Sequence, residues 1–135
     1  MGAVGNILYP EKFNSKRIRT HPDFEEELKD ILERSGYKQR FIRLYRLRLK
    51  HLEKYWEQCI NKRDWFEVLK GTSGLYSMRF KGGSKNIRIL FRFTSFEKRE
   101  IALLLCTFEE KDTKDYRKAI EIADRRYEEI KYLLD

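Results

Sequence analysis

The chain has 135 residues, enough for one hydrophobic core and too few for two ordinary domains. An aromatic share of 14% excludes an intrinsically disordered chain, and the lack of a long apolar run excludes a membrane-spanning helix. The formal net charge of +8 favours a polyanionic partner over a small acidic ligand, and two widely spaced cysteines favour the reducing cytoplasm over a disulfide framework.

The first part of the chain predicts an extension, a weak strand and a helix. Residues 1–14 show no periodic pattern, and we expect a loosely attached extension before a single domain over residues 15–135. Residues 16–20 hold one apolar residue in five and predict at best an edge strand. Residues 20–23 predict a helix start with a hydroxyl cap and a first-turn proline, and the helix should end at residues 35–36. Its inward face is predicted to be Phe24, Leu28, Ile31 and Leu32.

A second helix is predicted from about residue 38 to residue 60, followed by a break and a short helical turn over residues 65–69. Its buried stripe should be Ile42, Tyr45, Leu49, Leu52 and Trp56. Basic residues recur on another face of this helix, where they could neutralise phosphates, although a charge-rich helix face is more often simply solvated. These residues are Arg43, Arg46, Lys50 and Lys54.

The apolar period changes to two after residue 75, which predicts strands. Residues 75–80, 86–93 and 101–108 should form a three-strand antiparallel meander, with the last strand covered on both faces. An apolar seam then predicts a C-terminal helix from about residue 115. The predicted fold class is therefore α+β: this meander, with a possible N-terminal edge strand, packed by two N-terminal helices and a C-terminal helix.

Two arginines on neighbouring predicted strands form the first candidate site. If the hairpin is symmetric about residues 83–84, Arg79 lies opposite Arg88. Two facing guanidinium groups repel each other, and a phosphate between them would relieve the repulsion and match their geometry. A solvated surface on which glutamates neutralise each arginine, or a register shifted by one residue, explains the pair equally well.

The charged loop after the third strand is the second candidate. Lys111 and Tyr116 are able to move or stabilise a proton at the rim of the sheet. The favoured alternative is that Asp112 or Asp115 caps the last helix and that Tyr116 packs as its first seam residue. The chain has no nucleotide-binding glycine loop, zinc-protease motif or serine-hydrolase elbow, and we expect neither a cofactor nor a metal site.

Several segments carry a family resemblance in their order and spacing. They are LYSMRF at residues 75–80, NIRILFRF at 86–93, LLLCTF at 103–108 followed by Lys111, AIEIA at 119–123, and HPDFEEEL at 21–28. They resemble the RelE/ParE superfamily, and within it the HigB-like, phage-derived toxins. The resemblance covers about residues 65–134 and implies the toxin of a type II toxin–antitoxin system. Such a toxin is a metal-independent endoribonuclease that cuts mRNA, usually on the ribosome.

The resemblance also implies residue roles. Arg88 would clamp the scissile phosphate and Arg79 would assist it, while Lys111 would stabilise developing charge or act as an acid. Tyr116 would act as a base or as a stacking platform, and a base near neutral pH requires a lowered pKa. Further RNA-binding candidates are Lys81, Lys85, Arg92, Lys114, Arg43, Arg46, Lys50 and Lys54.

The chain departs from the HigB-like pattern at three places near the site, and at one of them Tyr116 stands where that group often has proline. Cys106-Thr107 stands where the pattern has His-Gly, and Glu110-Lys111 where it has a Lys-Lys pair. The partners that the resemblance implies are a cognate antitoxin, mRNA and the rRNA of the ribosome, with no membrane and no metal. The alternatives are a non-catalytic DNA gyrase inhibitor of the ParE kind and a plain nucleic-acid-binding module.

Overall fold

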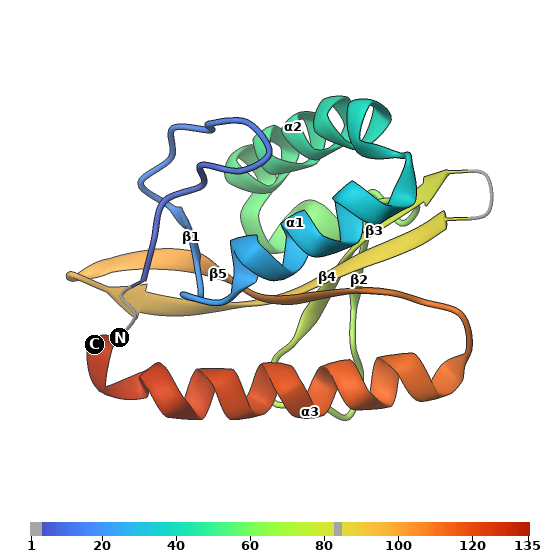
Figure 1. Cartoon of the computed structure of the whole chain (residues 1–135). Helices are drawn as coiled ribbons and strands as arrows, with labels where there is room; N and C mark the ends of the chain where they lie inside the picture. Colours follow the sequence, from blue (N-terminus) through green and yellow to red (C-terminus); the bar gives the residue numbers. More distant parts are fainter. Residues whose placement is uncertain (1–3, 83–84) are drawn as a thin grey trace.

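The computed structural model describes residues 4–82 and 85–135, with the side chains of residues 82 and 85 left out. Five strands form one sheet, which lies between two layers of helices (Figure 1). The strands are β1 (Ile18–Thr20), β2 (Phe66–Val68), β3 (Tyr76–Gly82), β4 (Lys85–Phe96) and β5 (Arg99–Glu109). The helices are α1 (Phe24–Ser35), α2 (Lys38–Tyr55) and α3 (Thr113–Ile130), with short 3-10 helices η1 (Trp56–Asn61) and η2 (Lys131–Leu133).

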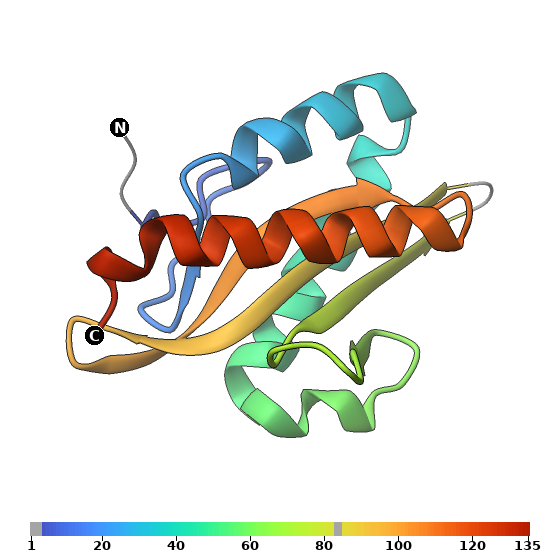
Figure 2. The same cartoon turned by 90° about the horizontal axis from the view of Figure 1, so that it is seen from below.

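The strand order is β1-β5-β4-β3-β2, with β1 parallel to β5 and the remaining pairs antiparallel. Helices α1 and α2 cover one face of this sheet and α3 covers the other (Figures 1 and 2). Each face has its own apolar core, and β5 contributes to both, because residues 101–107 are buried throughout. The predicted α+β class, the N-terminal edge strand and the doubly covered strand are confirmed.

The short helical turn predicted over residues 65–69 is wrong, because the segment forms strand β2. The backbone N–H of Arg79 donates to the carbonyl of Trp65 at 2.8 Å, and the N–H of Leu69 donates to the carbonyl of Leu75 at 2.9 Å. The Phe66 side chain enters the core on the α2 side. A segment this short takes the structure for which a hydrogen-bonding partner exists, and the free edge of β3 supplies that partner.

The expected loose attachment of the N-terminal extension is wrong for the residues that the structure describes. Ile7 is only 1% exposed and belongs to the core. Gly5 exchanges two backbone hydrogen bonds of 2.9 Å with Thr20, which covers the outer edge of β1. The carboxylate of Glu25 accepts the N–H groups of Leu8 and Tyr9. The extension is anchored because its backbone hydrogen-bonds to the otherwise open edge of β1.

The two N-terminal helices differ from prediction at their ends. Helix α1 starts at Phe24, and Asp23 precedes it, so the predicted hydroxyl cap and the proline in the first turn are wrong. Backbone hydrogen bonds to Gly5 hold Thr20 in an extended bridge instead. Helix α2 ends at Tyr55, and Trp56, with φ of 55°, turns the chain into η1. On α2, Phe41 and Arg48 are buried in addition to Tyr45, Leu49 and Leu52, while Ile42 and Trp56 are only half-buried.

Both cysteines lie in the interior of the fold. Cys59 and Cys106 are free and buried, and burial raises the pKa of each thiol to about 12. At neutral pH these thiols are protonated and behave as small apolar side chains.

Candidate functional site

The predicted register of the central hairpin is confirmed, and Arg79 and Arg88 are direct cross-strand partners. Both project from the sheet on the side that α3 covers, as do Ser77 of β3 and Phe108, the β5 partner of Arg88. Strand alternation alone brings these side chains to one face, since residues two apart on a strand point the same way. The hairpin tip about which the pairing is symmetric, residues 83–84, lies outside the described residues.

The two arginines are neutralised unequally. Arg88 is 3% exposed, and its Nη2 lies 3.0 Å from Oε1 of Glu110. Arg79 is half-buried, and Nη1 donates to the carbonyl of Arg63 at 3.4 Å. Within the described residues no carboxylate pairs with Arg79, and Nε of each arginine is buried without a hydrogen-bond partner. The glutamate-neutralised alternative is thus correct for Arg88 only, and both groups keep unused donors.

Tyr116 joins this cluster from the first turn of α3. Its hydroxyl lies 2.9 Å from Oγ of Ser77, and its ring meets that of Phe108 edge-on at 5.0 Å. Burial raises the pKa of Tyr116, which the Ser77 hydrogen bond and the positive charge of Arg88 offset only in part. The hydroxyl is therefore neutral at physiological pH and suited to donate a hydrogen bond. The lowered pKa that a tyrosine base requires is not present.

An open pocket of about 620 Å³ lies beside this cluster. Arg79, Glu110 and Tyr116 line it together with residues 67–70 and Ile120. It forms where β3 and β2 extend beyond α3, which packs mainly on β5 (Figure 2). A ligand in this pocket would meet Arg79 directly, and it would reach Arg88 only if Glu110 turned aside.

The loop before α3 carries the cap and Lys111. Asp112 caps α3 by accepting the N–H of Lys114 at 2.8 Å, and the carboxylate of Asp115 accepts the N–H of Asp112 at 2.9 Å. The capping alternative is thus confirmed for Asp112. The Lys111 side chain is exposed and lines a different pocket, with acidic residues that include Glu27. The structure brings Arg79, Arg88 and Tyr116 together and places Lys111 apart from them.

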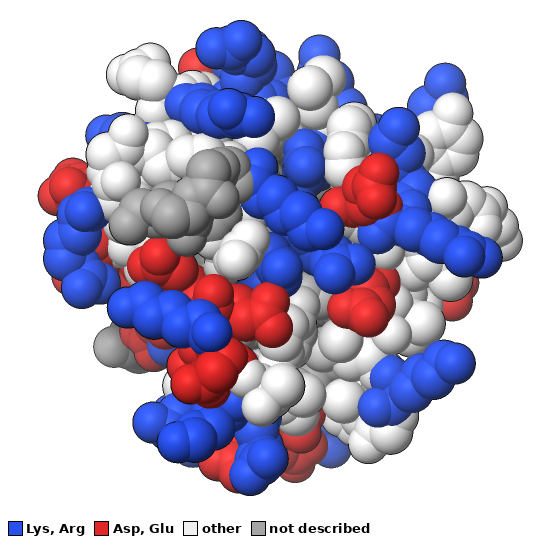
Figure 3. All heavy atoms as spheres, turned by 90° about the vertical axis from the view of Figure 1, so that its right-hand side faces the viewer, with Lys and Arg blue, Asp and Glu red and all other residues white. Residues whose placement is uncertain are grey.

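The remaining basic candidates fall into two groups. Lys81 and Lys114 are exposed near the hairpin end of the sheet, where Figure 3 shows Lys and Arg side chains from the centre of the face toward its right edge, with Asp and Glu side chains among them. The side chain of Lys85 lies outside the described residues, and the Arg92 guanidinium stacks on Tyr127 at 3.8 Å. The second group is exposed on α2, on the opposite side of the sheet, with Arg46 paired to Glu11: Arg43, Arg46, Lys50 and Lys54.

Sequence reasoning missed Arg48, which fixes the strand that carries Arg79. Arg48 is 5% exposed, and its Nε donates to the carbonyl of Arg79 at 2.8 Å. Its guanidinium lies over the rings of Trp65 and Phe80, at 4.6 and 4.9 Å. Burial lowers the pKa of Arg48 to about 10. The spacing of Arg48 from Tyr45 and Leu52 places it on the same face of the helix, and this was the signal in the sequence for its burial. The basic residues around Arg48 concealed that signal.

Sequence reasoning also gave no role to Ser77 or Glu110, the partners of Tyr116 and Arg88. In the part of the chain described, no group of three His, Cys, Asp or Glu side chains is placed to hold a metal ion. Nor is any helix of the described residues long and apolar enough to span a membrane.

The model of the family described as Phage derived protein Gp49-like (DUF891) matches residues 40–128. The matched segment runs from α2 into α3, so it contains the arginine pair, Glu110 and Tyr116, and it leaves out β1 and α1. No curated protein and no solved structure matches the chain significantly.

Proposed function

The chain belongs to the Gp49-like family of phage-derived proteins, a family associated with the toxins of toxin–antitoxin systems, and we propose that it is the toxin of a type II system. We propose a HigB-like, metal-independent endoribonuclease that cuts mRNA on the ribosome. A cognate antitoxin would hold it inactive. The site of action would be the cytoplasm.

One observation carries this proposal: Arg79 and Arg88 face each other across two strands, beside an open pocket that Tyr116 also lines. The carboxylate of Glu110 lies 3.0 Å from Nη2 of Arg88, and a phosphate oxygen can bind a guanidinium in the same way. A bridging RNA phosphate entering the pocket would contact Arg79 first and then displace Glu110 from Arg88. Two guanidinium groups would then hold one phosphate.

The arrangement suits attack by a neighbouring 2′-hydroxyl on the bound phosphorus. The new bond joins the 2′-oxygen to phosphorus, the bond to the 5′-oxygen breaks, and the products are a 2′,3′-cyclic phosphate and a free 5′-hydroxyl. The arginines offset the extra negative charge of the pentacoordinate transition state. Once displaced from Arg88, the Glu110 carboxylate is free to accept the proton of the 2′-hydroxyl.

Tyr116 has a proposed role at the phosphate, and Lys111 has one at the leaving 5′-oxygen. The neutral Tyr116 hydroxyl donates to a phosphate oxygen, exchanging Ser77 for substrate. Lys111 offsets charge on the leaving 5′-oxygen and donates the proton that makes it a 5′-hydroxyl. This requires the Lys111 side chain to leave the acidic pocket that it lines in the free protein. Lys81, Lys85, Arg92 and Lys114 bind flanking RNA phosphates, and the basic face of α2 binds rRNA.

The proposal is tested by incubating the purified protein with translating ribosomes and a 5′-labelled mRNA. We expect shortened mRNA whose new 3′ ends carry a 2′,3′-cyclic phosphate. The same protein is incubated with DNA gyrase and supercoiled plasmid. Intact mRNA together with gyrase-trapped DNA breaks would establish the ParE-like alternative instead. RNA binding without cleavage and without toxicity on expression would establish a plain binding module.

Replacing Tyr116 with phenylalanine should lower the cleavage rate by about 10²-fold, because one donor to the transition state is lost. Burial raises the pKa of Tyr116, so the hydroxyl stays protonated at every pH below its ordinary value. The pH–rate profile of Tyr116→Phe should therefore keep the parent's shape between about pH 6 and pH 9. Ser77→Ala, which keeps the phenol, serves as the matched control. Loss of the rising, acid-side limb of the profile in Tyr116→Phe alone would show that Tyr116 is the base.

A further inference from the structure

A second pocket is formed by residues of the N-terminal loop and β1. In Figure 1 this loop and β1 lie toward the other end of the sheet from the hairpin. It has a volume of about 570 Å³ and is lined entirely by residues 6–19. Three of its lining side chains are cationic, Lys12, Lys16 and Arg19, and none of its described lining residues is acidic. A neighbouring hollow shares Lys16 and Arg19 and adds Phe96, Glu97 and Arg99.

The loop that forms this pocket is held rigid from outside. The Leu8 and Tyr9 N–H groups donate to Glu25 of α1 at 2.9 and 3.0 Å. Glu11 pairs with Arg46 of α2, and Oγ of Ser15 donates to Glu53 of α2. The carboxylates of Glu25, Glu11 and Glu53 are therefore engaged outside the pocket. A preformed pocket loses little conformational entropy when it binds a ligand.

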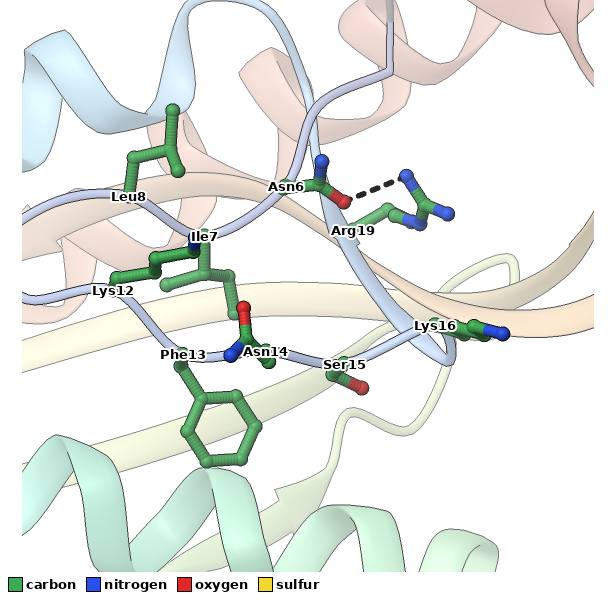
Figure 4. Close-up of a pocket in the computed structure, with 9 residues that line it drawn as sticks. All are labelled: Asn6, Ile7, Leu8, Lys12, Phe13, Asn14, Ser15, Lys16 and Arg19. Carbon is green, nitrogen blue, oxygen red and sulfur yellow. Dashed lines mark hydrogen bonds between the residues drawn. The ribbon is translucent and has the colours of Figure 1, made fainter.

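Among the described residues, the cations of the pocket form no ion pair with an acidic side chain. Lys12 and Lys16 are exposed, and neither forms an ion pair within the ranges 4–82 and 85–135. Arg19 donates to Oδ1 of Asn6 at 2.8 Å, and its Nε is buried without a hydrogen-bond partner. Figure 4 shows this Asn6 contact and the Asn14 side chain reaching into the gap between the two loop segments. The pocket thus offers donors and positive charge to an anion.

The pocket also has an apolar side. Leu8 is 62% exposed, while Phe13 points away from the pocket toward α2 (Figure 4). An exposed leucine beside uncompensated lysines fits a ligand that carries both carboxylates and apolar side chains. A nucleic-acid backbone would use the cations and leave Leu8 in water, so charge and apolar area together favour an acidic peptide.

The residues of this pocket lie outside the segment that the family model matches, residues 40–128. The pocket is therefore not part of what defines the family, whereas the arginine pair lies within it. A feature that the shared fold does not require is suited to selecting a particular partner.

We propose that residues 6–19 form a docking site for an acidic, partly apolar peptide segment of the cognate antitoxin. Carboxylates of that segment pair with Lys12, Lys16 and Arg19, and an apolar side chain covers Leu8. Only the identity of the partner rests on the proposed toxin function. The site itself is separate from the Arg79 and Arg88 cluster.

The test measures fluorescence anisotropy of a labelled amphipathic peptide of Glu and Leu, added to the full-length protein. A Gln and Leu peptide of the same pattern is the neutral comparison. We expect only the acidic peptide to bind, and Lys12→Glu/Lys16→Glu to weaken its binding by about tenfold or more. Leu8→Ser should weaken binding as well, by about threefold or more. The charge-matched control Lys29→Glu/Lys118→Glu, on exposed positions of α1 and α3, should bind within about twofold of the parent.

A labelled oligo(U) RNA and the variant Arg88→Ala separate the two proposals. Peptide binding that survives in Arg88→Ala supports the docking site whether or not the protein cleaves RNA. No binding of the acidic peptide, or equal loss in both double variants, would overturn it. So would a Lys12→Glu/Lys16→Glu variant that loses oligo(U) but keeps the peptide, because the surface would then bind nucleic acid. Circular dichroism and thermal unfolding verify that each variant is folded.

Discussion

Arg88→Ala should lower the rate of RNA cleavage by about 10³-fold or more, because an arginine that offsets transition-state charge contributes at least that much in phosphoryl transfer. Arg88 is the buried member of the arginine pair, and Glu110 already holds its guanidinium in a fixed orientation. The measurement is the initial rate of cleavage of a labelled mRNA on translating ribosomes. Arg88→Lys should recover only part of the loss, since an ammonium group lacks the planar fork of donors.

Two further variants make the Arg88 result interpretable. Arg125→Ala removes an exposed arginine whose ion pair among the described residues is with Glu129 of its own helix, and it should cleave at the parent's rate. Glu110→Gln keeps the shape of the side chain but removes its charge, so RNA should bind more tightly while the cleavage step slows. An Arg88→Ala variant that is folded and cuts as fast as the parent would place the active site elsewhere.

Arg126→Met should lower the free energy of unfolding by about 3 kcal/mol, the usual cost of leaving a half-buried carboxylate without its partner. Arg126 joins Glu27 through two contacts of 2.8 and 3.2 Å and donates to the carbonyl of Leu105 at 2.8 Å. Glu27 in turn accepts the N–H of Thr107 at 3.0 Å. Strand β1 pairs with β5 only as far as Leu104. Beyond Leu104, the side chains of Arg126 and Glu27 therefore hydrogen-bond to the backbone at the edge of β5, where a neighbouring strand would otherwise do so.

Urea unfolding followed by circular dichroism measures this effect. The neighbouring Arg125→Met removes an exposed arginine from the same helix and should change the free energy of unfolding by less than about 0.5 kcal/mol. The double variant Glu27→Gln/Arg126→Met should lose less than the sum of the two single variants, because the partners share one interaction. Additive losses would show that the two side chains stabilise the protein independently.

The features that the sequence predicted correctly are those set by local rules. Alternation of apolar and polar residues on two strands, together with the symmetric hairpin, predicted that Arg79 lies opposite Arg88, and the observed register agrees. Asp112 was a capping candidate because an acidic side chain before a helix can accept its free N–H groups. In both cases the interacting residues lie within a few positions or within one hairpin.

The features that sequence reasoning missed depend on contacts between distant segments. Strand β2 forms because the edge of β3 is free, and the N-terminal extension is anchored because β1 leaves an open edge. In the sequence, Arg48 resembles the surface cations around it, and only the packing of α2 against β3 shows that it is buried. None of these contacts has a periodicity that a sequence can show.

Sequence patterns were sufficient for the α+β class and offered the observed register of the arginine pair as one of two possibilities, because strand period and hairpin symmetry are properties of a short stretch of chain. They were not sufficient to identify the carboxylate that binds Arg88, the neutral state of Tyr116 or the pocket that Lys111 faces. Those facts depend on how α3 and the loop before it lie against the sheet, and this packing sets burial, and with it the charge state and reach of each group.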